Sequence, residues 1–156
     1  MFNVVLYEPE IPPNTGNIMR LCANVGCRLH LIEPLGFELD EKRLRRAGLD
    51  YVDWKNVSVY PNWQRFAEKA SLSALWAFST KATRLFSEAS IREGDYLLFG
   101  PETRGLPNAV MDAMSDAQRL RIPMVDGSRS LNLSNAVAIA LYGAWQQHAY
   151  RGRSQD

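Results

Sequence analysis

Short apolar runs alternate with segments of helical periodicity along most of this chain. We predict strands at Asn3–Tyr7, Arg28–Glu33, Val57–Tyr60, Ala74–Ser79, Asp95–Gly100 and Arg119–Pro123. Between them, apolar residues recur every three or four positions, as they do on the buried face of a helix. This alternation favours an α/β fold whose mostly parallel sheet has helices on both faces. No repeat or linker interrupts the pattern, so we expect a single domain over residues 1–156.

The first predicted helix has an apolar face and a polar face of unusual composition. We expect it to begin near Asn14, because two prolines oppose an earlier start and Asn is a good cap, and to end at Gly26. Its apolar positions are Ile18, Leu21, Cys22 and Val25. Its polar side carries three amides, one guanidinium and no acid, at Asn14, Asn17, Arg20 and Asn24. Such a side suits an uncharged polar or phosphate-bearing ligand, with capping and ordinary surface polarity as the alternative.

The last predicted helix runs from about Leu133 to His148 and carries one long apolar stripe. The stripe consists of Leu133, Ala136, Val137, Ala140, Leu141, Ala144 and Trp145. Ile139 and Tyr142 lie off this stripe, so a monomer would expose them and a partner subunit would cover them. Scattered apolar residues at a surface are common and provide the alternative explanation.

A polar loop, GPETRGLP at Gly100–Pro107, follows the fifth predicted strand. It lacks the glycine spacing of dinucleotide-binding and phosphate-binding loops, which argues against both. Gly100, at the end of the strand, would let a ligand approach the backbone closely. Glu102 is the only acid in the loop, and an ion pair with Arg104 is its simplest structural role.

A second polar loop, SRSLNLSN at Ser128–Asn135, precedes the last helix. Ser130 or Asn132 could cap that helix, but a cap accounts for one side chain and not for five Ser and Asn residues. In α/β proteins, loops that leave the carboxyl ends of parallel strands carry the chemistry. We therefore expect the two loops to line one pocket for a small zwitterionic or nucleoside-like ligand.

Charge gives only a weak indication of a nucleic-acid partner. The chain has 156 residues, of which 46% are apolar, and a formal net charge of +1, so no strong positive field surrounds it. Arginine nonetheless outnumbers lysine by 14 to 4, and arginine is the residue that binds phosphate in a bidentate manner. One basic cluster, at Lys42, Arg43, Arg45 and Arg46, could contact a phosphate backbone or simply form a solvated helix face.

The remaining composition indicates a cytoplasmic protein without metal or membrane. Cys22 and Cys27 are the only cysteines, and the N-terminal MFNVVLYEPE reads as a strand rather than a signal peptide. No apolar run approaches the length of a membrane span. The spacing of Cys22, Cys27 and His30 is loosely similar to that of metal ligands, but a fourth ligand is missing nearby, so we expect no metal site.

Three motifs, in this order, resemble those of the SPOUT superfamily of S-adenosylmethionine-dependent RNA methyltransferases. They are NTGNIMR at Asn14–Arg20, FGPETRGLP at Phe99–Pro107, and IPM with SRSLNLSNAVAIALY within Ile122–Tyr142. Within the superfamily, the chain is most similar to the small tRNA 2′-O-methyltransferases that act on the wobble nucleotide, a cytidine or modified uridine. The resemblance implies a deep trefoil knot at the C-terminal end, a homodimer with its active sites at the subunit interface, and the tRNA anticodon stem-loop as substrate.

The resemblance also implies roles for individual residues. The S-adenosylmethionine site would be lined by Phe78, Gly100, Ile122, Ser130 and Leu131, several through backbone groups. The catalytic arginine would be Arg20, with Asn14 as its neighbour. Polar positions near the acceptor would be Glu102, Ser130 and Asn132. Contacts to RNA are expected from Arg43, Arg45, Arg46 and Tyr142.

A methyl transfer of this kind mainly requires placement of a weak nucleophile, the ribose 2′-hydroxyl. Arg20 would stabilise the negative charge that develops on this oxygen or on the adjoining phosphate. A guanidinium is a poor base, so the proton acceptor could be the RNA phosphate, water or a strongly perturbed Arg20. The alternative function is a non-catalytic RNA-binding or nucleotide-sensing protein. A hydrolase is disfavoured because the loop serines have no histidine nearby in the sequence.

Overall fold

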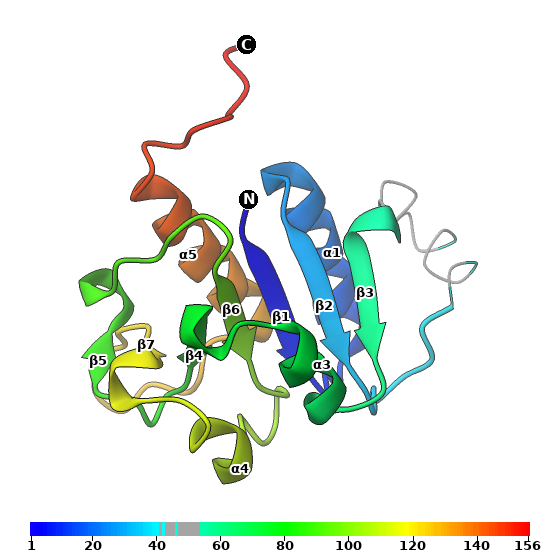
Figure 1. Cartoon of the computed structure of the whole chain (residues 1–156), viewed down its shortest axis with the longest axis horizontal. Helices are drawn as coiled ribbons and strands as arrows, with labels where there is room; N and C mark the ends of the chain where they lie inside the picture. The colour runs from blue at the N-terminus through cyan, green and yellow to red at the C-terminus, as the bar shows by residue number, and fades with distance from the viewer. Residues whose placement is uncertain (41, 43–45, 47–53) are drawn as a thin grey trace.

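One parallel sheet lies between two layers of helices (Figure 1). The structure is a computed structural model and describes residues 1–40, 42, 46 and 54–156. Within these residues, seven strands pair in the order β3-β2-β1-β6-β4-β7-β5, and every neighbouring pair is parallel. The strands are β1 (Asn3–Tyr7), β2 (Arg28–Ile32), β3 (Val57–Tyr60), β4 (Leu75–Phe78), β5 (Arg84–Leu85), β6 (Tyr96–Phe99) and β7 (Arg119–Arg121). This arrangement confirms the predicted α/β class.

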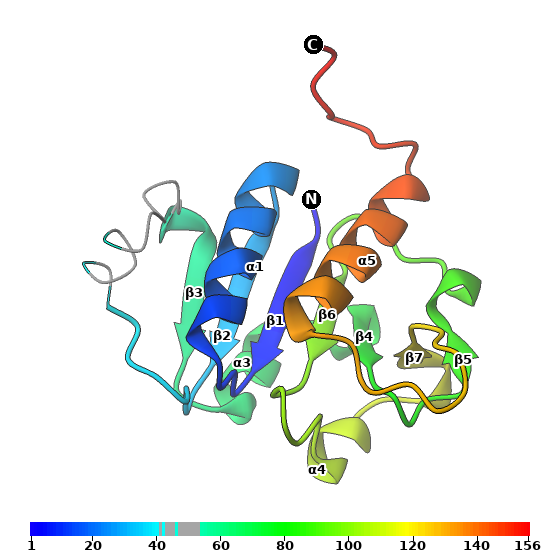
Figure 2. The same cartoon turned by 180° about the vertical axis from the view of Figure 1, so that it is seen from behind.

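Helices cover both faces of the sheet, as predicted. The described α-helices are α1 (Pro12–Val25), α3 (Trp63–Lys69), α4 (Asn108–Met111) and α5 (Leu133–Gln146). Single 3₁₀ turns occur at Trp54–Asn56, Phe86–Glu88, Leu72–Ala74 and Asp116–Gln118. Figure 2 shows α1 and α5 side by side on one face, whereas α3 and α4 lie on the other face (Figure 1).

Two apolar cores result, because successive residues of a strand point to opposite faces of the sheet. In β2, Leu29 and Leu31 pack in the core beneath α1 and α5, whereas Ile32 joins the core that contains Phe66 of α3. These side chains are at most 1% exposed, so the sheet is covered on both sides. A parallel sheet requires this double cover, which explains its nearly continuous apolar strands.

The strand prediction was accurate for the long strands and failed at one short edge strand. Strands β1 and β3 have the predicted bounds. For the other predicted strands, the observed bounds differ from the predicted ones by at most two residues at either end. Strand β7 stops at Arg121, before Pro123, which has no N–H to extend the ladder. Strand β5 is absent from the prediction because two residues, Arg84 and Leu85, form no apolar run.

The predicted start of α1 is wrong. The helix begins at Pro12, with Ile11 as its cap residue, and Asn14 lies inside the first turn. Proline is tolerated there because the first N–H groups of a helix have no partner within it. The end is as predicted: Gly26 has a φ of +75°, and the Cys27 N–H donates to the Cys22 carbonyl at 2.8 Å.

Helix α5 confirms its predicted stripe and its predicted cap. Leu133, Val137 and Leu141 are buried, and the Asn132 side chain accepts hydrogen bonds from the Ser134 and Asn135 N–H groups. Ile139 and Tyr142 are 41% and 43% exposed in the single chain. The helix ends at Gln146, slightly before the predicted end. The implied trefoil knot stays a prediction.

Candidate functional site

A pocket of about 590 Å³ opens at the carboxyl ends of β4, β6 and β7. Both polar loops contribute to its wall, as predicted, together with the first turns of α1 and α5. Every position expected to bind the cofactor lines it: Phe78, Gly100, Ile122, Ser130 and Leu131. The polar residues Asn14, Glu102 and Asn132 line it as well. The volume lies within the usual range for small-molecule and cofactor sites.

Three of these polar side chains form one hydrogen-bonded network, called here the pocket network: Glu102, Asn14 and Asn132. The Asn14 amide donates to the Glu102 carboxylate at 3.4 Å and accepts from Asn132 Nδ2 at 3.0 Å. Asn14 is only 5% exposed, so the amide predicted as a helix cap is in fact buried between the two loops. The network therefore joins the three motifs, which lie far apart in the sequence.

The Glu102 carboxylate is held mainly by backbone donors from the loop between β1 and α1. It accepts from the Glu10 N–H at 2.8 Å and from the Ile11 N–H at 3.1 Å. A carboxylate is favourable there because the start of α1 carries a partial positive charge. Arg104, the alternative partner considered for Glu102, instead lies 4.0 Å from carboxylate oxygens of both Glu8 and Glu10.

The backbone packing around position 100 requires a glycine there, whether or not a ligand is bound. A Cβ at this position would lie 2.4 Å from the backbone carbonyl carbon of Gly105 and equally close to the Leu106 nitrogen. The glycine thus lets the loop fold back tightly over the end of β6, with the Gly105 N–H donating to the Pro101 carbonyl at 3.0 Å. We predicted that a ligand would approach the Gly100 backbone closely, and in the structure the backbone of Gly105 and Leu106 makes such an approach.

Apolar side chains supply the rest of the pocket wall. The rings of Phe78 and Phe99 are stacked at 4.8 Å, and Ile122 and Met124 line the pocket with them. Leu131, which also lines the pocket, is 38% exposed. An apolar wall beside a cluster of amides suits a ligand with a flat ring and a polar tail.

Several lining residues were absent from the prediction, notably Ser79, Thr80 and Lys81 after β4 and Thr103 in the first loop. A signal for the first three existed, because they follow the carboxyl end of a predicted strand. They also form a run of three polar residues in the sequence.

Among the described residues expected to act on RNA, Arg20, Arg46 and Tyr142 do not line the pocket. Arg20 is exposed on α1, about 9 Å along the helix from Asn14 given its rise per residue, and Tyr142 is exposed on α5. Arg46 is exposed as well. Arg43 and Arg45 lie outside the described residues.

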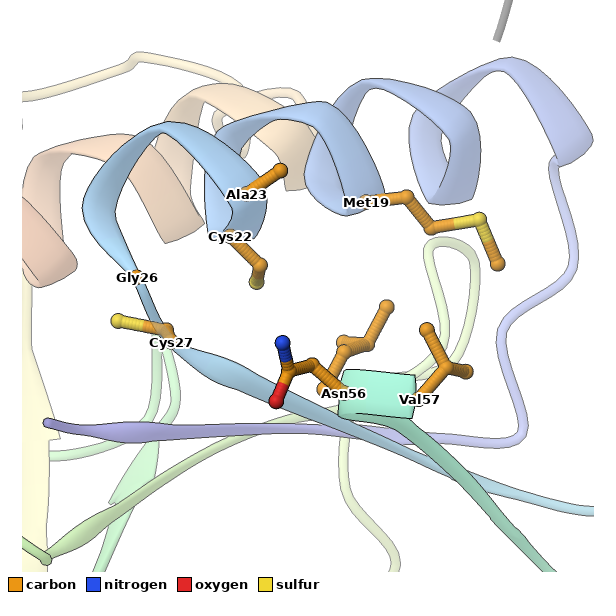
Figure 3. A pocket seen from close by; sticks show the side chains of 8 residues that line it. Met19, Cys22, Ala23, Gly26, Cys27, Asn56 and Val57 are labelled. Carbon is orange, nitrogen blue, oxygen red and sulfur yellow. The ribbon is translucent and has the colours of Figure 1, made fainter. Parts of the chain in front are cut away.

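The cysteines line a separate, smaller pocket of about 90 Å³ between α1 and β3. Figure 3 shows the sulfurs of Cys22 and Cys27 pointing in different directions. Both thiols are free and buried, and burial raises the pKa of Cys22 and raises that of Cys27 to about 11. These thiols therefore stay protonated at neutral pH and are poor nucleophiles.

His30 belongs to a buried hydrogen-bonded group. Its Nδ1 lies 3.0 Å from the Tyr60 hydroxyl, and its Nε2 lies 3.0 Å from Asn3 Oδ1. Burial, with a smaller effect of Arg28, lowers the pKa of His30 to about 4. No group of three or more metal-ligating side chains occurs within the described residues. No helix among them is long and apolar enough to cross a membrane.

Comparison with known proteins places the chain in a family. The model of the SpoU rRNA Methylase family matches residues 1–142. A tRNA (cytidine(34)-2′-O)-methyltransferase of Saccharophagus degradans is 60% identical over 152 residues, covering 97% of this chain and 99% of that protein. One from Escherichia coli K12 is 57% identical, covering 97% of each chain.

A solved structure agrees with these relatives. Its subject is "Structural insights into the 2-OH methylation of C/U34 on tRNA", and it is 44% identical to this chain. The match covers 97% of this chain and 98% of that one, with a TM-score of 0.85. By sequence, pocket and fold, this chain belongs to the SpoU rRNA Methylase family.

Proposed function

We propose that this protein is a tRNA 2′-O-methyltransferase that uses S-adenosylmethionine to methylate the ribose of the wobble nucleotide, position 34. The observation that carries the proposal is the pocket, which gathers residues from all three motifs into one lining. Relatives that match nearly the whole chain at 57–60% identity carry this activity in their names. A cytidine or a modified uridine would be the target.

The pocket fits the cofactor in shape and in chemistry. The stacked pair Phe78 and Phe99, with Ile122 and Leu131, provides an apolar wall for a flat ring. Gly100 and Ser130 line the pocket from the loops on either side, and we expect them to bind the cofactor through their backbone groups. When bound, the cofactor supplies a methyl group that is already electrophilic, so the protein need only bind and orient the reactants.

The acceptor hydroxyl must then be placed in line with that methyl group, and such placement can contribute roughly 7–11 kcal/mol in the best intramolecular models. We assign Arg20 to the stabilisation of negative charge on the hydroxyl oxygen or its phosphate. Asn14 and Asn132 would orient the ribose through amide groups that retain hydrogen-bonding capacity. Glu102, whose carboxylate is held by two backbone N–H groups, positions Asn14 rather than accepting the proton.

The anticodon stem-loop would contact the basic residues Arg43, Arg45 and Arg46. We further propose a homodimer built on the face that α1 and α5 form. Arg20 lies outside the pocket lining, and Ile139 and Tyr142 are exposed on α5, the helix that packs beside α1. A second copy would cover these apolar side chains and bring Arg20 of one protomer to the pocket of its partner. Residues 1–156 would act as one domain in the cytoplasm, without metal.

The decisive experiment is incubation of the protein with methyl-labelled S-adenosylmethionine and total tRNA that lacks the wobble modification. Mass spectrometry of the nucleosides should locate the label on the ribose at position 34. A label on a base would contradict the 2′-O assignment. Cofactor binding without any transfer would favour the nucleotide-sensing alternative.

Sedimentation equilibrium of the purified protein tests the proposed dimer. We expect the mass of two chains, and we expect Ile139→Asp, which places a charge on the exposed face, to sediment as one chain and to lose methyl transfer. A wild-type protein that sediments as one chain while active would contradict the shared site.

A further inference from the structure

Glu10 and Glu102 make reciprocal contacts between the two loops that follow β1 and β6. The Glu102 carboxylate accepts from the N–H groups of Glu10 and Ile11 at 2.8 and 3.1 Å. In return, Glu10 Oε1 accepts from the Thr103 N–H at 3.0 Å and from its hydroxyl at 2.8 Å. Each glutamate thus binds the backbone of the other loop. We call this set of contacts the glutamate bridge.

The glutamate bridge joins two sides of the same pocket. Strands β1 and β6 are neighbours in the sheet, so their loops leave the same edge side by side. Ile11 lines the pocket from the first loop, and Glu102 and Thr103 line it from the second. Glu10 is not among the lining residues, and its carboxylate accepts hydrogen bonds from Thr103, which is one of them.

Two close backbone approaches hold the bridge in one geometry. A Cβ on Gly36 would lie 2.8 Å from the Glu10 Cα, and the Gly36 N–H donates to the Pro9 carbonyl at 2.9 Å. On the other side, the second loop folds tightly onto Gly100. The loop after β2 therefore packs closely against the Glu10 backbone and fixes its position. The Glu10 carboxylate accepts a hydrogen bond from the Thr103 hydroxyl.

We propose that Glu10 is a positioning residue, which fixes the Pro101–Leu106 loop against the start of α1 and so maintains the shape of the cofactor pocket. The inference deepens the proposed function and rests on it. Charge-assisted hydrogen bonds are stronger than neutral ones, and each carboxylate of this bridge accepts at least two of them. Through Glu102 it also holds Asn14, and through Asn14 it holds Asn132 at the cap of α5.

The test compares variants of the bridge in the full chain by calorimetry with S-adenosylmethionine. Glu10→Ala should raise the Kd about tenfold, as expected for the loss of a charged hydrogen-bond acceptor. Thr103→Val, at an exposed position that should not disturb folding, should raise it about threefold by the same argument, and Thr103→Ser should restore it. The matched control is Glu93→Ala, an exposed glutamate in another loop, which should leave the Kd unchanged.

A double-mutant cycle separates a bridge from two independent contacts. Glu10→Ala combined with Thr103→Val should bind no more weakly than Glu10→Ala alone, because both changes remove the same interaction. Multiplying effects would overturn the proposal, as would a Kd for Glu10→Ala within twofold of the wild type. Failure of the wild-type protein to bind S-adenosylmethionine would instead overturn the proposed function.

Hydrogen exchange tests the glutamate bridge without S-adenosylmethionine, so the inference can be tested even if the wild-type protein does not bind the cofactor. Hydrogen exchange should show faster exchange at the Glu10 and Ile11 amides of Glu10→Ala, although these amides bond to Glu102 and not to Glu10. Protection that is lost only at Thr103 would show that the two glutamates act separately and would overturn the bridge as a unit.

Discussion

Two polar networks in this protein have similarly buried central side chains and differ in their surroundings. His30, with Asn3 and Tyr60, lies within the sheet on the α3 side, and Asn14, with Glu102 and Asn132, lies at the carboxyl edge. Their central side chains are almost equally buried, at 7% exposed for His30 and 5% for Asn14. Burial alone therefore does not distinguish a structural polar residue from a functional one.

The difference lies in unused hydrogen-bonding capacity and in access. Both ring nitrogens of His30 have hydrogen-bond partners. The centroid of its ring lies 5.9 Å from that of Phe66 and 5.6 Å from that of Tyr96. The Asn14 amide has two donors and two acceptor positions, of which Glu102 uses one donor and Asn132 uses one acceptor. Asn14 also lines the large pocket, which His30 does not. The closed network supports the fold, and the open one can bind a ligand.

The largest effect should come from Arg20, which lies on α1 beyond the open network. Arg20→Ala should lower the rate of methyl transfer by about 10²–10³, the usual cost of losing one donor that stabilises transition-state charge. Because the side chain is exposed, the free energy of unfolding should change by less than about 1 kcal/mol. Single-turnover kinetics and calorimetry with the cofactor measure the two steps separately. Intact transfer with intact cofactor binding would remove Arg20 from the mechanism.

The closed network around His30 should make the free energy of unfolding depend on pH in acid. The folded protein favours neutral His30, whose pKa is lowered to about 4, whereas the unfolded chain has the ordinary value of 6.5. Between these values the unfolded state binds more protons, so the free energy of unfolding should fall as the pH drops from 6.5 to 4, by about 3 kcal/mol in total. Urea unfolding at several pH values measures this loss.

His30→Gln provides the control for that experiment, because glutamine can hydrogen-bond but does not titrate. Its free energy of unfolding should lose the part of the pH dependence that His30 contributes. At pH 7 its affinity for S-adenosylmethionine should match that of the wild type, since His30 lies outside the pocket. An unchanged acid dependence would contradict the assignment to His30.

The smallest effect is expected at two asparagine caps, Asn132 and Asn62. Only Asn132 belongs to the pocket network. Asn132 caps α5 within the pocket network, and Asn62 caps α3 away from it by accepting from the Arg65 N–H at 2.9 Å. Replacing either with alanine should cost about 1 kcal/mol of unfolding free energy, the typical value for a cap. Only Asn132→Ala should also weaken cofactor binding, as measured by calorimetry. Equal binding by both variants would show that Asn132 acts only as a cap.

Much of the fold could be predicted because its signals are local. The bounds of β1 and β3, the buried stripe of α5, the glycine that ends α1 and the Asn132 cap all depend on residues within one element. The lining of the pocket was predicted for the two polar loops because carboxyl ends of parallel strands share one edge. Strand β5 was missed because two residues form no local pattern.

The detailed roles of the site residues could not be predicted in this way. Asn14 resembled a helix cap, yet it is the centre of a network whose partners lie 88 and 118 positions away in the sequence. Glu102 had an apparent partner two positions away in Arg104, but its donors are backbone groups 91 and 92 positions away. Local spacing contains no information about which distant loop a side chain will meet.

The sequence by itself determined the α/β class, the faces that α1 and α5 bury, and the family to which three ordered motifs point. Periodicity and end signals act between neighbours in the chain, so they can be read without a structure. Only the tertiary structure decided the strand order, the glutamate bridge, the tight packing on Gly100 and the burial of Asn14. These features arise when the sheet brings the loops after β1 and β6 together, and buried polar groups must then find their partners across that contact.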